Sequence, residues 1–196
     1  MRNLILVAIL LAFGSTLSAQ GLKGTWFVGG MVDFGKSEKY VDDVKIKKDT
    51  YGLMPLLGTF VTPDLAVGGA IGFSQVKFDS NNKSTTFTIM PLVRKYWNIT
   101  GNLFVFGQAA LPVGIGKDKS GGLKDDQFSM HFQLAPGFDL IVNKWMTIEA
   151  SFALLNAGFT RNKPDEGKST TDWSINGNSI ASSTIGDISV GVKFLF

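Results

Sequence analysis

The feature that most constrains this chain is an alternation of apolar residues with a period of two along most of its length. Residues 128–142 read FSMHFQLAPGFDLIV, in which the even-numbered residues are apolar and the odd-numbered ones are polar or small until Ile141. Residues 26–34, 146–154 and 188–196 repeat the pattern. Successive side chains of a β-strand point to opposite faces, so the alternation predicts strands with one apolar face and one mixed face.

Eight such runs predict an all-β fold, an eight-stranded antiparallel up-and-down transmembrane β-barrel. Short and long connections alternate, as they do in transmembrane barrels. The strands are expected at about 23–35, 50–61, 65–78, 85–97, 103–115, 127–142, 145–159 and 184–196. The short connections are expected at 62–64, 98–102 and 143–144, and the long ones at 36–49, 79–84, 116–126 and 160–183.

The composition of the 196-residue chain excludes several kinds of site. There is no Cys and a single His, which excludes disulfides, thiolate metal sites and a His-based metal cluster. We therefore expect no metal and no cofactor. The net charge is only +3, and the Lys residues alternate with Asp instead of forming a basic stripe, so a nucleic-acid partner is not expected.

The N-terminus has the features of a secretory signal peptide. Arg2 precedes an apolar run from Leu4 to Phe13, and small residues come before Gln20. We expect cleavage after Ala19, which leaves residues 20–196 as one outer-membrane barrel domain. The alternative is an N-terminal membrane anchor, but the apolar run has only about half of the ~20 residues that a spanning helix needs.

The charged residues of the strands decide which face points inward. Arg94, Asp139, Glu149 and Lys193 all belong to the mixed register of their strands. An Arg or Lys on the lipid face near the midplane costs about 2–4 kcal/mol. The mixed face should therefore line the lumen, and the apolar face should contact hydrocarbon inside a closed cylinder without free edges.

The same four residues are expected to form a charge cluster in the lumen. An antiparallel ladder sets Glu149 roughly opposite Lys193, and the connection at 143–144 puts Asp139 about level with Glu149. Arg94 lies a similar distance from its own short turn. Two cations and two anions would then fill the narrow interior as a neutral plug. The alternative is a relay for protons or ions.

Aromatic residues near the short connections predict a belt at one membrane interface. The alternative is a set of unrelated core aromatics. Four prolines fall inside predicted strands, where each removes a ladder donor, so bulges or strand ends are expected there. The belt residues are Trp26, Tyr96, Trp97 and Trp145, and the prolines are Pro55, Pro91, Pro112 and Pro136.

The signal peptide, the alternating strands, the unequal connections and the terminal VKFLF together resemble the small eight-stranded outer-membrane barrels of Gram-negative bacteria. The resemblance is to the outer-membrane protein A and X type, a porin-family-like group, and it covers nearly all of the mature chain. It implies that Val192, Phe194 and Phe196 form the C-terminal signal that the barrel assembly machinery reads.

The leading functional hypothesis is a monomeric, non-enzymatic integral outer-membrane protein with a filled lumen. It would contact outer-membrane lipids, support envelope integrity or adhesion, and bind an extracellular partner through the loops 36–49 and 160–183. The rival functions are a narrow porin-like channel, a soluble lipocalin-like carrier and a lipid-modifying enzyme. The enzyme would use Ser129, His131 and Glu149, but the expected register separates His131 from Glu149 by more than about 20 Å.

Overall fold

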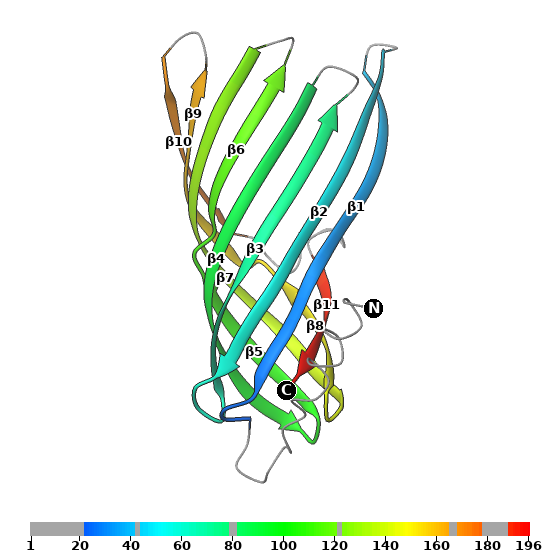
Figure 1. Ribbon diagram of the computed structural model, residues 1–196, viewed down its shortest axis with the longest axis vertical. Helices are drawn as coiled ribbons and strands as arrows, with labels where there is room; N and C mark the ends of the chain where they lie inside the picture. Colours follow the sequence, from blue (N-terminus) through cyan, green and yellow to red (C-terminus); the bar gives the residue numbers. More distant parts are fainter. Residues whose placement is uncertain (1–21, 42–43, 79–81, 121–122, 165–167, 178–187) are drawn as a thin grey trace, which may run out of the picture.

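The computed structural model describes residues 22–41, 44–78, 82–120, 123–164, 168–177 and 188–196. The expected signal peptide, residues 1–19, lies outside this part of the chain. The described strands number eleven, and three of the barrel's eight spans are each divided into two of them (Figure 1). The strands are β1 (Trp26–Val41), β2 (Val44–Phe60), β3 (Leu65–Phe78), β4 (Asn82–Thr100), β5 (Leu103–Ala110), β6 (Val113–Ser120), β7 (Leu123–Asn143), β8 (Met146–Phe152), β9 (Leu155–Pro164), β10 (Thr170–Gly177) and β11 (Ile188–Leu195).

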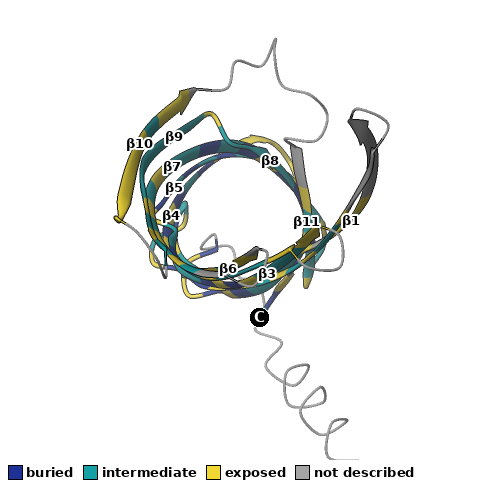
Figure 2. Ribbon diagram, turned by 90° about the horizontal axis from the view of Figure 1, so that it is seen from above, coloured by how far each residue is buried: buried dark blue, intermediate teal, exposed yellow. Residues whose placement is uncertain are grey.

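The strands form one antiparallel sheet that closes on itself. β5 and β6 together make one span between β4 and β7, and β8 and β9 make the next. β11 completes the ring by pairing with β8 on one side and with β1 on the other. Figure 2, which views the molecule from above, shows the resulting ring. The predicted all-β, eight-stranded barrel is confirmed.

The N- and C-terminal strands meet at the short-turn end of the barrel. Residues Phe27–Gly30 of β1 pair with Val192–Leu195 of β11. Below them, Trp26 and Phe196 exchange two backbone hydrogen bonds, with N–O distances of 2.9 and 2.8 Å. The last residue of the chain therefore takes part in closing the wall, which leaves no open sheet edge at this level.

Burial alternates along the strands as the pleat requires. On β4, Met90, Leu92, Arg94 and Tyr96 are buried, whereas the residues between them are more exposed. The mixed register thus faces the lumen and the apolar register faces outward. Exposed outward side chains include Val32, Leu53, Leu57, Ile71, Ile89, Val93, Ile115, Phe138, Leu140, Ile148 and Val190.

The regions predicted as long loops are largely strand, which corrects that part of the prediction. The segment 36–49 continues β1 and β2 up to the pair Val41–Val44. Most of 116–126 belongs to β6 and β7, and 160–183 contains the end of β9 and all of β10. Many residues of these strand ends are Lys, Asp, Ser, Thr or Asn, so apolar alternation is weak there, although Trp173 and Ile175 of β10 still alternate with polar residues. Backbone hydrogen bonds still extend the ladder there.

The four strand prolines lie where the ladder on one side is interrupted, and only Pro112 lies at a strand end as expected, whereas Pro55, Pro91 and Pro136 lie inside β2, β4 and β7. Pro55 falls at a gap in the β2–β3 pairing, between Leu53 and Leu56. Pro91 lies where β4 changes partner from β5 to β6, and Pro112 lies in the break between those two strands. Pro136 lies where β7 changes partner from β9 to β8. A missing N–H therefore falls where no ladder bond is made.

Candidate functional site: the filled lumen

The structure brings the four predicted lumen charges into one buried cluster. Arg94 donates to Glu149 through Nη1 at 2.6 Å and Nη2 at 3.3 Å. Lys193 lies 2.5 Å from Asp139 Oδ2 and 3.0 Å from Glu149 Oε2. Lys193 is only 1% exposed and Glu149 only 9%. Two cations thus neutralise two carboxylates, which is what makes burial of all four tolerable.

Strand register accounts for part of this arrangement. Asp139 and Glu149 are directly opposite on β7 and β8. Lys193 is opposite Thr147, so it reaches Glu149 diagonally on the neighbouring strand, close to the position the sequence predicted. Arg94 comes from β4, which is not a neighbour of β8, and it reaches Glu149 across the lumen.

Polar and aromatic groups complete the coordination of the two cations. Arg94 Nε donates to Gln108 at 2.6 Å, and its guanidinium lies 4.7 Å from the centre of the Phe106 ring. Lys193 Nζ donates to the Tyr96 hydroxyl at 3.1 Å and lies 5.5 Å from the centre of the Phe27 ring. The cluster is therefore held by charge-assisted hydrogen bonds and by cation–π contacts.

A floor of aromatic rings closes the lumen on the short-turn side of the cluster. Phe27 packs edge-on against Phe60 at 5.8 Å between centroids. Phe60 then contacts Tyr96 at 5.2 Å, and Tyr96 contacts Phe106 at 5.6 Å. All four rings are at most 3% exposed. The lower interior is thus filled by two layers, an aromatic floor and a charge cluster.

Glycines opposite the lumen side chains create the space for this packing. Phe27 is paired with Gly58 and Phe106 with Gly137. A Cβ on Gly58 would lie 2.2 Å from the Phe27 ring, and one on Gly137 would lie 2.4 Å from the Phe106 ring. Gly29, opposite Lys193, similarly leaves room for the lysine stem.

A cavity of about 180 Å³ lies on the outer side of the charge cluster. Its polar lining residues are Arg94, Gln108, Gln133, Glu149 and Ser151, and the rest of the wall is methionine, leucine, alanine or glycine. Those wall residues include Met31, Met54, Leu56, Ala70, Met90, Leu92, Ala135 and Ala153. Within the described part of the lumen, the cavity is therefore closed on its short-turn side by the charge cluster and the aromatic floor.

Three of the four predicted belt residues lie outside the barrel, and one lies inside. Trp26, Trp97 and Trp145 are each about half exposed at the short-turn end. Tyr96 is buried in the lumen against Lys193, so it is not part of the exposed belt. Tyr96 lies two residues after Arg94 on β4, so the alternation of side chains along the strand by itself predicts that Tyr96 points inward, as Arg94 does.

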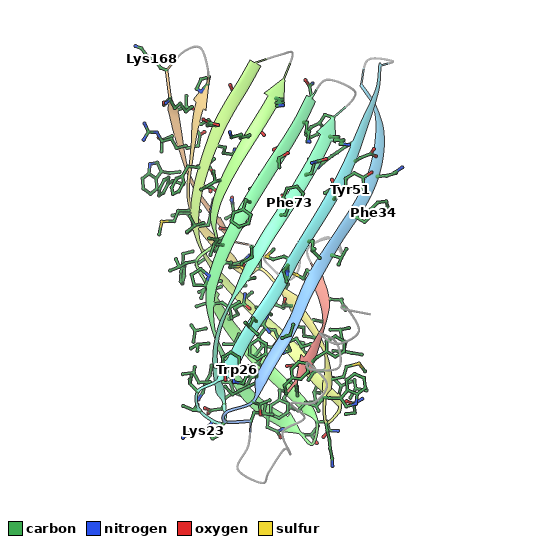
Figure 3. All side chains as sticks on the ribbon, viewed as in Figure 1. Lys23, Trp26, Phe34, Tyr51, Phe73 and Lys168 are labelled. Atoms are coloured by element: carbon green, nitrogen blue, oxygen red, sulfur yellow. The ribbon has the colours of Figure 1, made fainter. Side chains whose placement is uncertain are left out.

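A second set of outward aromatic residues lies nearer the opposite end, where none was predicted from the sequence. Figure 3 shows Trp26 near the short turns and Phe34, Tyr51 and Phe73 higher on the barrel, toward but below the opposite end. Phe34 and Tyr51 are directly opposite each other, with centroids 5.3 Å apart. The members are Phe34, Tyr51, Phe73, Phe87, Phe128 and Trp173, all exposed. Their outward register on successive strands would have revealed this outer aromatic set. Exposed apolar residues thus lie between two aromatic sets, as they do on transmembrane barrels.

The predicted assembly signal occupies the edge of the closing strand. Val192 and Phe194 point outward and are 42% and 41% exposed, and Phe194 stacks on Trp145 with centroids 5.9 Å apart. Phe196 makes the two backbone bonds to Trp26 described above. Leu195, between the two phenylalanines, is buried inside.

The residues considered for catalysis are kept apart by the register. His131 is opposite Gly158 and contacts Thr160 at 3.5 Å, whereas Glu149 is opposite Asp139 and is engaged by two cations. Within the described part of the chain, no group of three or more metal-ligating side chains is found. Among the same residues, no helix is long and apolar enough to cross a membrane.

The turn between β2 and β3 holds an exposed ion pair. Asp64 receives hydrogen bonds from Lys95 of β4 and from the Thr62 hydroxyl, the latter at 2.8 Å. The bond from Lys95, and after it the one from Thr62, lowers the pKa of Asp64 below its ordinary value. The Asp64 carbonyl also accepts from the Tyr96 backbone N–H at 2.7 Å, which fixes the turn against β4.

Comparison with known proteins places the chain by fold. No protein-family model and no curated protein sequence matches it. Neisserial surface protein A (NspA) matches with a TM-score of 0.51 and 15% identity, over 89% of this chain and 98% of that chain. The translocator domain of the autotransporter NalP from Neisseria meningitidis matches with a TM-score of 0.50 and 12% identity, over 100% of this chain and 96% of that chain. The chain therefore has the fold of the small eight-stranded outer-membrane β-barrels.

Proposed function

We propose that this protein is a non-enzymatic integral protein of the Gram-negative outer membrane whose barrel does not conduct. The observation that carries the proposal is the division of the wall: apolar side chains face outward between two aromatic sets, whereas charged ones pair inside. Such a surface suits acyl chains, and a closed ladder leaves few backbone groups unpaired in lipid.

The filled lumen supports a structural role over a channel. An ion crossing the barrel would have to pass both the aromatic floor and the cluster around Lys193, which is 1% exposed. Opening that path would separate buried ion pairs, at a cost of several kcal/mol per unpaired charge. Contribution to envelope integrity is therefore the function that the interior favours.

The outer ends of the strands support a second part of the proposal, contact with a partner outside the cell. β1 and β2 continue for seven residues beyond Phe34 and Tyr51, to the pair Val41–Val44. At ~3.3 Å per residue this adds roughly 20 Å along the strands. The extended hairpins, including parts of 36–49 and 160–183, would offer a rigid platform for adhesion or partner binding.

Two measurements test the proposal. The processed protein should fractionate with outer membranes, resist alkaline extraction and require detergent for release. In planar lipid bilayers it should give no steady conductance steps. Recovery in the aqueous fraction would contradict membrane residence. Reproducible channels from an inserted protein would contradict only the closed lumen and would leave membrane residence standing.

A further inference from the structure

An unusual arrangement of like charges lies on the outer wall of the barrel. Lys77 of β3 is directly opposite Lys83 of β4, and Lys83 is directly opposite Lys119 of β6. All three side chains are exposed and belong to the outward register. Directly opposed like charges on one face destabilise a sheet. The three lysines therefore repel one another, and no carboxylate lies between them in the row to offset this repulsion.

Few carboxylates balance this row. Asp49 is opposite Lys77 at one side of it, and Asp126 is opposite Lys117 in the adjacent row. No carboxylate is in register with Lys83 or Lys119, because Lys83 lies between Lys77 and Lys119, and Lys119 is opposite Lys124 of β7 on its other side. The described residues contain no ion pair that involves Lys83 or Lys119.

An apolar groove adjoins these lysines. It is open, has a volume of about 450 Å³, and is lined by Phe73, Phe87, Ile115, Thr85, Lys83, Lys117 and Lys119. The three apolar residues form a single row across β3, β4 and β6, directly below the lysine-bearing rows. The groove thus has an apolar floor at one end and a cationic rim at the other.

The height of the groove places its two ends in different parts of a membrane. Phe87 and Trp97 are both on β4, with Trp97 in the belt at the short turns. At ~3.3 Å per residue and a tilt of ~40°, Phe87 lies roughly 25 Å above Trp97, which is the height of the apolar band of such barrels. Lys83 lies roughly 10 Å higher, at the level of lipid headgroups.

We propose that the groove of β3, β4 and β6 is a binding site for a phosphate-bearing lipid of the outer leaflet. An acyl chain would lie on Phe73, Phe87 and Ile115, and the headgroup phosphates would bind Lys83, Lys117 and Lys119. Anionic phosphate would relieve the repulsion within the lysine row, and ammonium groups bind phosphate as point charges. The rim faces sideways from the wall, so the ligand would be a lipid beside the barrel.

The site goes beyond the proposed function but depends on membrane residence, so insertion is measured separately in every sample. The assay measures lipid bound to the full processed chain in a neutral detergent, by native mass spectrometry. Its probes are bisphosphorylated lipid A, the same lipid without phosphates, and inorganic phosphate as a competitor. We expect saturable binding of the phosphorylated lipid only, without competition by free phosphate.

The decisive variant is Lys83→Gln with Lys119→Gln. Loss of two surface lysines should weaken lipid A binding about 10- to 30-fold. The matched control is Lys23→Gln with Lys144→Gln, which removes the same charge at the exposed short-turn end. This control should bind lipid A as the wild type does.

Different results would overturn the lipid site and the proposed function. Equal weakening by both double variants would mean that only net charge matters and would overturn the site. Equal binding of the phosphate-free lipid, or displacement by inorganic phosphate, would also overturn it. Any of these results in a chain that still inserts into vesicles would leave the proposed function standing, whereas failure of the wild type to insert would overturn that function.

Discussion

Arg94 of β4 and Glu149 of β8 form a two-point ion pair across the lumen, although β5 and β7 separate the two strands in the barrel wall. The pair joins opposite parts of the ring from inside. Together with the contact of Lys193 with Asp139, it links strands that share no ladder. The cluster therefore acts as an internal brace as well as a plug.

Replacing one partner of this pair should destabilise the barrel strongly. Arg94→Met leaves Glu149 with Lys193 alone, so the cluster then holds two carboxylates and one cation. An unbalanced buried charge costs about 3–5 kcal/mol. The free energy of unfolding in urea, measured in lipid vesicles, should fall by about this amount.

The double variant Arg94→Met with Glu149→Met provides the control for charge balance. It leaves Lys193 paired with Asp139 and fills the space with apolar side chains, so most of the lost stability should return. A double variant as unstable as the single one would show that packing, and not charge balance, dominates at this site.

Adding a methyl group beneath a lumen ring should also destabilise the barrel. Gly58→Ala and Gly137→Ala each place a Cβ within 2.4 Å of an aromatic ring, so Phe27 or Phe106 must move. We expect a loss of about 1–3 kcal/mol for each variant, typical of overpacking, in the same urea unfolding assay.

Gly69→Ala is the matched control, because the nearest atom to its new Cβ is 3.5 Å away. Its free energy of unfolding should change by less than about 0.5 kcal/mol. If all three variants lost similar stability, the cause would be a general effect of alanine in strands. The clash of the new Cβ with the Phe27 or Phe106 ring would then not explain the loss.

The exposed tryptophans at the short turns should report one membrane interface. Variants that retain only Trp26, Trp97 or Trp145 should be quenched most by lipids brominated close to the headgroup. A Val93→Trp probe in a chain without other tryptophans lies roughly 10 Å deeper along β4, so lipids brominated further down the chain should quench it more. The same depth for all four probes would contradict the belt.

The turn at Asp64 should give a small pH-dependent contribution to stability. Because the pKa of Asp64 is lower in the folded state, its ion pair with Lys95 stabilises the fold above the ordinary carboxyl value of about 3.9 and loses this effect as pH falls through the lowered folded pKa. Asp64→Asn should therefore melt slightly below the wild type at neutral pH, and the two should converge in acid. Addition of salt should also reduce the difference, since the pair is exposed.

Several parts of the structure follow from short-range rules that a single sequence carries. Alternation along 128–142 and 188–196 predicted strands and their facing, because the pleat sends every second side chain to the same face. The high cost of Arg or Lys in hydrocarbon assigned Arg94 and Lys193 to the interior. The proximity of Asp139 and Glu149 followed from the short turn at 143–144, which fixes their register.

Other parts depended on the closed barrel. Strand ends such as 36–41 carry no apolar alternation, so only the backbone ladder shows that β1 and β2 continue there. The contact of Arg94 with Glu149, the seating of Phe27 over Gly58 and the convergence of Lys83 and Lys119 on one groove all involve residues far apart in the sequence. Periodicity determined which face each side chain takes, whereas curvature, stagger and closure of the sheet decided which side chains meet, because those properties belong to all eight spans together.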